Sequence, residues 1–355
     1  MSQQSTTRQP RRRDLDFLRV AAMMAVIVIH CVMPITIMRL PSDADWPAAE
    51  LLDSYMRWCV PVFVMISGAL LIRPSTYQNL GRYFYRRVSR ILVPLVAWPI
   101  LYALWLLAAG NSQVTWQAFW HGIALGDPIG GTQLYFLFII AGLYVLAPLI
   151  SLYAAKVRSS TFCLTALMLL AAASMWYMVA ATIPGYSGSY TALTWCLPFI
   201  GYFMLGLSLR DLQPRRIQTI LAVVGFMTLG LLNTVLTTFT RIDDNFFFQS
   251  YQSPTVIGLS ICAFVGGKAL YARLAASTWP SSVRAFLGRS LSWLSRASFG
   301  VYLVHVMILD TIVLLFALDK GSLATAGWLL VAVPPLSLIV VSCLSRIPLV
   351  KHLVI

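Results

Sequence analysis

The sequence predicts an all-α membrane protein, a polytopic bundle of about ten transmembrane helices with both termini in the cytoplasm. Of its 355 residues, 59% are hydrophobic and only 11% are charged, whereas soluble domains carry about 25% charged residues. Apolar segments of about 20 residues, the length that crosses a bilayer, recur along the whole chain. The basic residues fall mainly on alternate connections between these segments.

The spans follow one another with short connections. The first comes after a polar, basic tail (1–16), and it is too long for a signal-peptide core and lacks a small-residue cleavage site, which predicts a retained signal anchor. The second is short and begins near Arg57. A tail (346–355) follows the last, and the chain reads as one domain, 1–355, with a bundle over 17–345. The predicted spans are 17–37, 56–72, 91–110, 133–154, 160–182, 193–209, 217–240, 253–272, 299–317 and 323–345.

The charge distribution predicts the orientation. With the N-terminus in the cytoplasm, 22 of the 26 Lys and Arg residues lie on the inner side, and most acidic residues lie outside. This asymmetry follows the positive-inside rule. It accounts for the net charge of +14 without nucleic acid as a partner. Membrane lipids are expected around the bundle, and a basic, aromatic inner segment (268–298) is predicted to form an amphipathic helix at the interface.

Other function classes find little support. The six cysteines show no spacing typical of a metal site or a disulfide scaffold, so no metal is expected. The sequence has no internal repeat of 20–50 residues. It also lacks two matching halves with paired broken helices, which many secondary transporters contain.

The first span contains Asp16, Arg19 and His30. Ionisable residues inside spans are costly and are therefore candidate functional residues. Arg19 and His30 are eleven residues apart, which places them on one helix face about 16 Å apart. Alternatively, Arg19 is an interfacial residue paired with Asp16, and His30 is a packing histidine bonded to a carbonyl.

Three more groups follow. Ser67 and Gly68 form a small pair typical of close helix packing, with access for a ligand as a second role. In the ninth span, His305 is either structural or supporting, and Asp310 lies at a depth that suggests an orienting contact with His30. On an inner connection, basic residues spaced at i,i+4 suit phosphate binding or anchoring on anionic lipid; they are Arg82, Arg86 and Arg90.

Two outer loops, near 111–132 and 241–252, combine aromatic side chains with acids and amides. Such loops suit the binding of sugars. The pattern favours the aromatic belt at a membrane interface over a sugar site.

Together the motifs resemble the acyltransferase 3 family of integral-membrane acyltransferases. The first-span stretch LDFLR…H contains the family's Arg-x10-His pair, Arg19 and His30. Four more segments match in the same order: FVMISGALLI, RRVSRILVP, QLYFLFIIAGLYVLAPLI and FGVYLVH. Two positions depart from the pattern, because Tyr135 stands where the family usually has Trp and Gln133 where it often has His.

The resemblance implies a stand-alone enzyme similar to the O-acetyltransferase of enterobacterial common antigen, in the bacterial inner membrane. It implies transfer of an acyl group, most simply acetyl, from cytoplasmic acyl-CoA to a hydroxyl of a cell-surface or lipid-linked polysaccharide, with no permanently bound cofactor. Arg86 and Arg90, with Arg82, are expected to bind acyl-CoA, and His30 with Arg19 to serve catalysis, His30 as a base or as a transient acyl carrier. Asp16, Ser67, Tyr135, His305 and Asp310 are the expected supporting residues.

Two alternatives remain open from the sequence. One is an exporter of polysaccharide or lipid-linked sugar, and the other is a non-catalytic membrane sensor or scaffold. An exporter needs a continuous path through the bundle, and a sensor needs no acyl-CoA.

Overall fold

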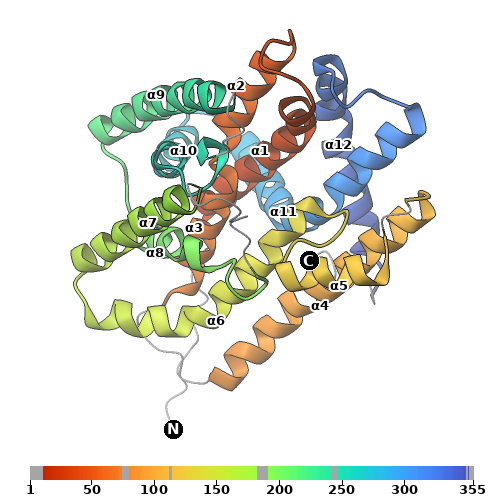
Figure 1. The fold of residues 1–355 in the computed structure, drawn as a ribbon. Coiled ribbons are helices and arrows are strands. Elements are labelled where there is room, and N and C mark those ends of the chain that lie inside the picture. The colour runs from red at the N-terminus through yellow and green to blue at the C-terminus, as the bar shows by residue number, and fades with distance from the viewer. Residues whose placement is uncertain are drawn as a thin grey trace.

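The computed structural model describes residues 11–73, 80–111, 114–181, 191–241, 247–348 and 351. Within these ranges the chain is helical, without strands (Figure 1). The elements are α1 (Arg13–Met38), α2 (Trp46–Met56), α3 (Cys59–Leu71), α4 (Leu80–Ala108), α5 (Trp116–Leu125), η1 (Thr132–Leu134), α6 (Tyr135–Lys156), α7 (Ser159–Ala181), η2 (Leu197–Phe199), α8 (Ile200–Arg210), α9 (Arg216–Arg241), η3 (Phe247–Gln249), α10 (Pro254–Ala275), α11 (Ser281–Phe316) and α12 (Leu323–Leu344).

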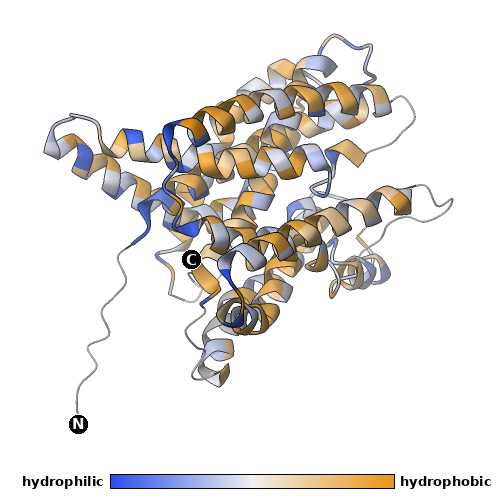
Figure 2. Cartoon of the chain, turned by 90° about the vertical axis from the view of Figure 1, so that its left-hand side faces the viewer, coloured by the Kyte–Doolittle hydropathy of each residue, from blue (hydrophilic) through white to orange (hydrophobic). Residues whose placement is uncertain are grey.

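The predicted all-α polytopic bundle is confirmed. Nine helical segments of the described chain are long and apolar enough to cross a membrane, and the shorter apolar segment Leu197–Arg210 stands at the position of the sixth predicted span. Large apolar side chains are exposed along the outer helices, among them Met168, Phe239 and Val331. Figure 2 shows that hydrophobic residues make up most of the long helices, and the exposed ones suit lipid rather than water.

Helix α1 lies at the centre of the bundle. It packs against α2, α3, α10, α11 and α12 (Figure 1). Its buried residues recur all round the helix, from Leu15 to Thr36, as expected for a helix surrounded by protein. The two residues that the sequence placed on one face, Arg19 and His30, are therefore held by a helix that packs against five others.

Close contact between α3 and α8 explains the small residues in both helices. A Cβ atom on Gly68 would overlap the carbonyl group of Phe203, and one on Gly206 would overlap the carbonyl group of Met65. The two backbones therefore touch, and the close packing predicted for Ser67 and Gly68 is confirmed.

The second predicted span differs from the prediction. Helical structure already begins at Trp46, stops between α2 and α3 at Arg57 and Trp58, and resumes at Cys59. Pro61 explains the break, because a proline inside a helix removes one backbone hydrogen bond and clashes with the preceding turn. Arg57 consequently lies in the middle of a segment that runs from Trp46 to Leu71, not at the start of a span.

The segment 268–298 also differs from the prediction. Instead of a separate helix lying at an interface, α10 extends to Ala275 and α11 begins at Ser281 and continues without a break into the ninth span. The first residues of α11, 281–287, are exposed in succession. No proline interrupts α11, so nothing in its sequence separates the amphipathic part from the span.

Candidate active site

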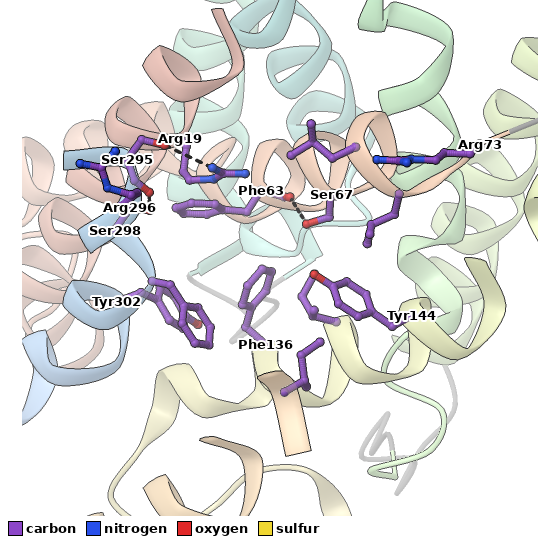
Figure 3. A pocket seen from close by; sticks show the side chains of 15 residues that line it. Arg19, Phe63, Ser67, Arg73, Phe136, Tyr144, Ser295, Arg296, Ser298 and Tyr302 are labelled. Atoms are coloured by element: carbon purple, nitrogen blue, oxygen red, sulfur yellow. Dashed lines mark hydrogen bonds between the residues drawn. The ribbon is translucent and has the colours of Figure 1, made fainter. Parts of the chain in front are cut away.

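A cavity of about 460 Å³ opens among α1, α3, α4, α6 and α11. Among the described residues, the guanidinium groups of Arg19, Arg73 and Arg296 line it (Figure 3). Aromatic rings line the rest, and Phe63, Phe136 and Tyr302 lie within 6.3 Å of one another by ring centroids. None of the described residues that line the cavity is acidic. It therefore combines a positive rim with an apolar interior, which suits a ligand with an anionic head and a slender apolar arm.

Arg19 is held by its neighbours in a defined position. Its Nη1 donates to Ser295 Oγ at 3.2 Å and lies 3.7 Å from Asp16 Oδ1. Ser295 in turn donates to Asp16 Oδ1 at 2.6 Å, and Arg11 Nε donates to Asp16 Oδ2 at 2.5 Å. The predicted pairing of Asp16 with Arg19 is confirmed, and the buried carboxylate of Asp16 orients a guanidinium that also lines the cavity.

Arg73 and Arg296 differ from Arg19 in their surroundings. Both side chains are exposed, and neither forms an ion pair with a residue of the described ranges. Arg73 follows α3, and its backbone N–H donates to Ser151 Oγ at 3.1 Å. Arg19 and Arg73 lie on either side of the cavity in Figure 3. Sequence reasoning did not single out Arg73 or Arg296, because both looked like ordinary basic residues of inner connections.

The expected acyl-CoA arginines lie on α4. The side chains of Arg82, Arg86 and Arg90 are outside the described part of the structure. The helix that carries them runs along the cavity, since Ile91 lines it and the hydroxyl of Tyr83 donates to the carbonyl oxygen of Tyr144, another lining residue, at 2.9 Å.

His30 lies beyond the aromatic end of the cavity and does not line it. Its ring packs edge-on against His305 of α11, with centroids 5.0 Å apart and an interplanar angle of 62°. The ring of His305 is 5.8 Å from that of Tyr302, which does line the cavity. Tyr302 and His305 thus connect the cavity to His30, and the hydroxyl of Tyr302 is fixed because it donates to the carbonyl oxygen of Gln133.

The expected contact between His30 and Asp310 is wrong. Asp310 Oδ1 accepts from Lys320 Nζ at 2.6 Å, so its carboxylate is engaged toward the far end of α11. The imidazole of His305 occupies the place beside His30 instead. The reason is helical phase, since residues 305 and 310 point about 140° apart on one helix and only one of them can face α1.

A buried polar cluster lies near His30 and is centred on residues of α2. Glu50 and Asp53 are fully buried, and Asp53 pairs with Arg57. Arg57 Nη1 also donates to the carbonyl oxygen of Gln249 at 3.0 Å, and Gln249 Nε2 donates to Glu50 Oε2 at 3.1 Å. Sequence reasoning missed this cluster because it placed Glu50, Asp53 and Gln249 in two outer loops and Arg57 at the start of a span. The i,i+4 spacing of Asp53 and Arg57 was the signal available.

The two outer loops do not form one surface in the described residues. Trp116 and Trp120 of α5 are exposed. Tyr251, from the other loop, is instead drawn inward, where its hydroxyl lies 3.1 Å from that of Tyr135. Tyr135 also packs on Trp195, with centroids 5.1 Å apart. Tyr135, at the position where the family usually has Trp, therefore places a hydroxyl among aromatic side chains. These side chains lie on the same side of the bundle as Arg57.

Comparison with known proteins decides the family. A family model described as an acyltransferase domain matches residues 12–346, nearly the whole chain. The chain belongs to the acyltransferase 3 family. No curated protein and no solved structure matches the chain. As an acyltransferase 3 protein with nine long apolar helices among its described residues, it is a membrane acyltransferase.

Proposed function

We propose that this acyltransferase 3 protein moves an acyl group, acetyl in the simplest case, from acyl-CoA to a hydroxyl of a cell-surface or lipid-linked glycan in the bacterial inner membrane. The observation that carries the proposal is the arrangement of the cavity. Cationic side chains line its rim, aromatic side chains line its interior, and His30 lies directly beyond its aromatic end.

The donor fits the cavity by charge and by shape. The phosphates of acyl-CoA bind at Arg19, Arg73 and Arg296, with Arg82, Arg86 and Arg90 of the neighbouring α4 as further contacts. The pantetheine arm extends along Phe63 and Phe136 toward Tyr302. This orientation places the basic end of the bundle in the cytoplasm, where acyl-CoA is available, in agreement with the positive-inside distribution.

The transfer requires a base near the thioester. In the proposed reaction a ring nitrogen of His30 takes the proton of the acceptor hydroxyl, and the hydroxyl oxygen attacks the thioester carbonyl carbon. The carbon–sulfur bond breaks, and the CoA thiolate leaves with the proton from His30 as a free thiol. The acyl group ends on the acceptor oxygen. The aromatic and polar residues near Arg57 and Tyr135 lie on the acceptor side.

The proposal is tested with the purified protein in lipid nanodiscs. Wild-type protein is expected to release CoA thiol from acetyl-CoA in the presence of acceptor glycan. His30→Ala is expected to lose this activity by about 10²–10⁴-fold, while it retains acetyl-CoA binding and the wild-type melting temperature. Full activity in His30→Ala would exclude the mechanism, and no acetyl-CoA binding in wild-type protein would favour a sensor or scaffold.

The acceptor is tested in cells. Surface glycans are compared by NMR with and without the gene, and with the His30→Ala variant. Loss of O-acyl signals in both mutant strains supports glycan acylation. Loss of the glycan itself from the cell surface would instead indicate an exporter.

A further inference from the structure

His305 is the closest described ring to His30 and comes from a different helix. The two centroids are 5.0 Å apart, edge-on, and His305 is fully buried. A hydrogen bond between two ring nitrogens spans about 2.9 Å. Adding the distance from each nitrogen to the centre of its own ring gives a centroid separation close to the one observed. The torsion that turns a histidine ring is broad, so the ring of His30 can rotate to direct one of its nitrogens toward His305.

The backbone of α11 fixes the proton on His305. Its Nδ1 lies 2.7 Å from the carbonyl oxygen of Tyr302 and 3.2 Å from that of Val301. A carbonyl oxygen only accepts, so Nδ1 carries the proton and donates. The other nitrogen, Nε2, is then left with a lone pair. Nε2 is buried and has no hydrogen-bond partner within the described residues.

The surroundings of His30 leave His305 as the acceptor beside it. Among the described residues, the imidazole of His305 and the guanidinium of Arg57 are the titratable groups that act electrostatically on His30. Arginine has only donors, and the guanidinium of Arg57 is already bound to Asp53 and to the carbonyl oxygen of Gln249. A buried acceptor without a partner is unfavourable. An N–H of His30 is the donor that the geometry offers to Nε2.

We infer that His305 is a positioning residue, whose Nε2 accepts a hydrogen bond from one ring nitrogen of His30. This bond fixes the tautomer of His30 and keeps the lone pair of its other nitrogen for the acceptor hydroxyl. The chain of contacts runs from the carbonyl oxygen of Tyr302 through His305 to His30. His305 thereby orients His30, as a carboxylate orients the histidine in many catalytic sites.

The inference rests on the proposed function, and three substitutions at one position test it. His305→Gln keeps an acceptor at the place of Nε2. His305→Asn reaches only the place of Nδ1, and His305→Phe keeps the ring shape without any polar atom. Each variant is measured for acetyl-CoA KM and kcat, and its melting temperature is recorded.

His305→Asn and His305→Phe are expected to lower kcat by about 10- to 100-fold, with the KM for acetyl-CoA unchanged. His305→Gln is expected to recover most of that loss. A purely structural role predicts instead that activity follows the melting temperature and that Gln and Asn behave alike. If the Phe variant does not fold, the comparison of Gln with Asn decides.

Equal activity in the Gln and Asn variants, whether full or lost, overturns the inference. The proposed function stands separately in that case, because it depends on wild-type activity and on its loss in His30→Ala. If wild-type protein transfers no acyl group, the proposed function fails, and the role of His305 fails with it.

Discussion

Replacing Arg73 and Arg296 by Gln should weaken the binding of acetyl-CoA without slowing the chemical step. Both guanidiniums line the cavity, and neither is bound to an acidic residue of the described chain, so each is available to an anion. Gln keeps much of the length of the side chain and removes the charge. The hydrogen bond from residue 73 to Ser151 uses the backbone N–H, so Arg73→Gln leaves it in place.

The size of the effect follows from the exposure of these side chains. A hydrogen bond to a charged group contributes about 1.5–3 kcal/mol when it is shielded from water, and exposed pairs contribute about 1 kcal/mol or less. At the exposed rim we expect about 1 kcal/mol for each arginine, or about a fivefold rise in KM. Arg73 follows α3 and Arg296 lies on α11, on separate sides of the cavity, so the double variant should show about a 25-fold rise.

The assay is the release of CoA thiol by protein in nanodiscs at several salt concentrations. The wild-type KM should rise with ionic strength, and the double variant should lose most of this dependence. Arg39→Gln is the matched control, because Arg39 lies beyond the other end of α1 and is paired with Asp319 at 2.9 Å. An unchanged KM in the double variant, or an equal rise in Arg39→Gln, would refute the donor site at this rim.

Three further predictions concern stability and access. Gly206→Ala should lower the melting temperature, with a loss of about 1–3 kcal/mol or more, because the new methyl group meets backbone that cannot move aside; a wild-type melting temperature would contradict the contact between α3 and α8. Ser67→Leu should raise the KM for acetyl-CoA and leave the melting temperature unchanged, since the side chain lines the cavity; a KM equal to wild type would show that the donor takes another route. Partial burial acts to raise the pKa of Asp211, but hydrogen bonds from Arg12 and Arg210 outweigh it and hold the pKa below its ordinary value. This stabilisation is present at neutral pH and is lost as the pH falls through the lowered pKa. Asp211→Asn should therefore melt slightly below wild type at pH 7 and together with it in acid, and a constant difference across the pH range would exclude this pair as the cause.

The sequence predicted features that depend on one helix at a time. Hydropathy located the long helices, and the spacing of Arg19 and His30 placed both on a single face of α1. The pairing of Asp16 with Arg19 followed from a separation of three residues. Each of these inferences needs only the helical repeat.

Contacts between helices were not predictable in this way. His30 and His305 are 275 positions apart, and periodicity assigns a phase to each helix without saying which faces meet. The depth of Asp310 in the membrane made it a reasonable partner for His30. Its side chain, however, lies on a different side of α11 from His305, so it does not face His30. The break at Pro61 moved Arg57 from an expected boundary into the bundle, and with it the buried carboxylates Glu50 and Asp53 became neighbours of the candidate site.

Arg19 and His30 lie on one unbroken helix. The spacing between them along α1 therefore determines which length of donor fits. One residue inserted between them would turn His30 by about 100° and move it by about 1.5 Å. Hydropathy and charge would hardly change, yet the histidine would face away from α11. Lengthening this stretch restores the orientation only when the insertion approximates whole turns. A relative of this enzyme that accepts a longer donor is therefore expected to widen or deepen its cavity and to keep the spacing in α1.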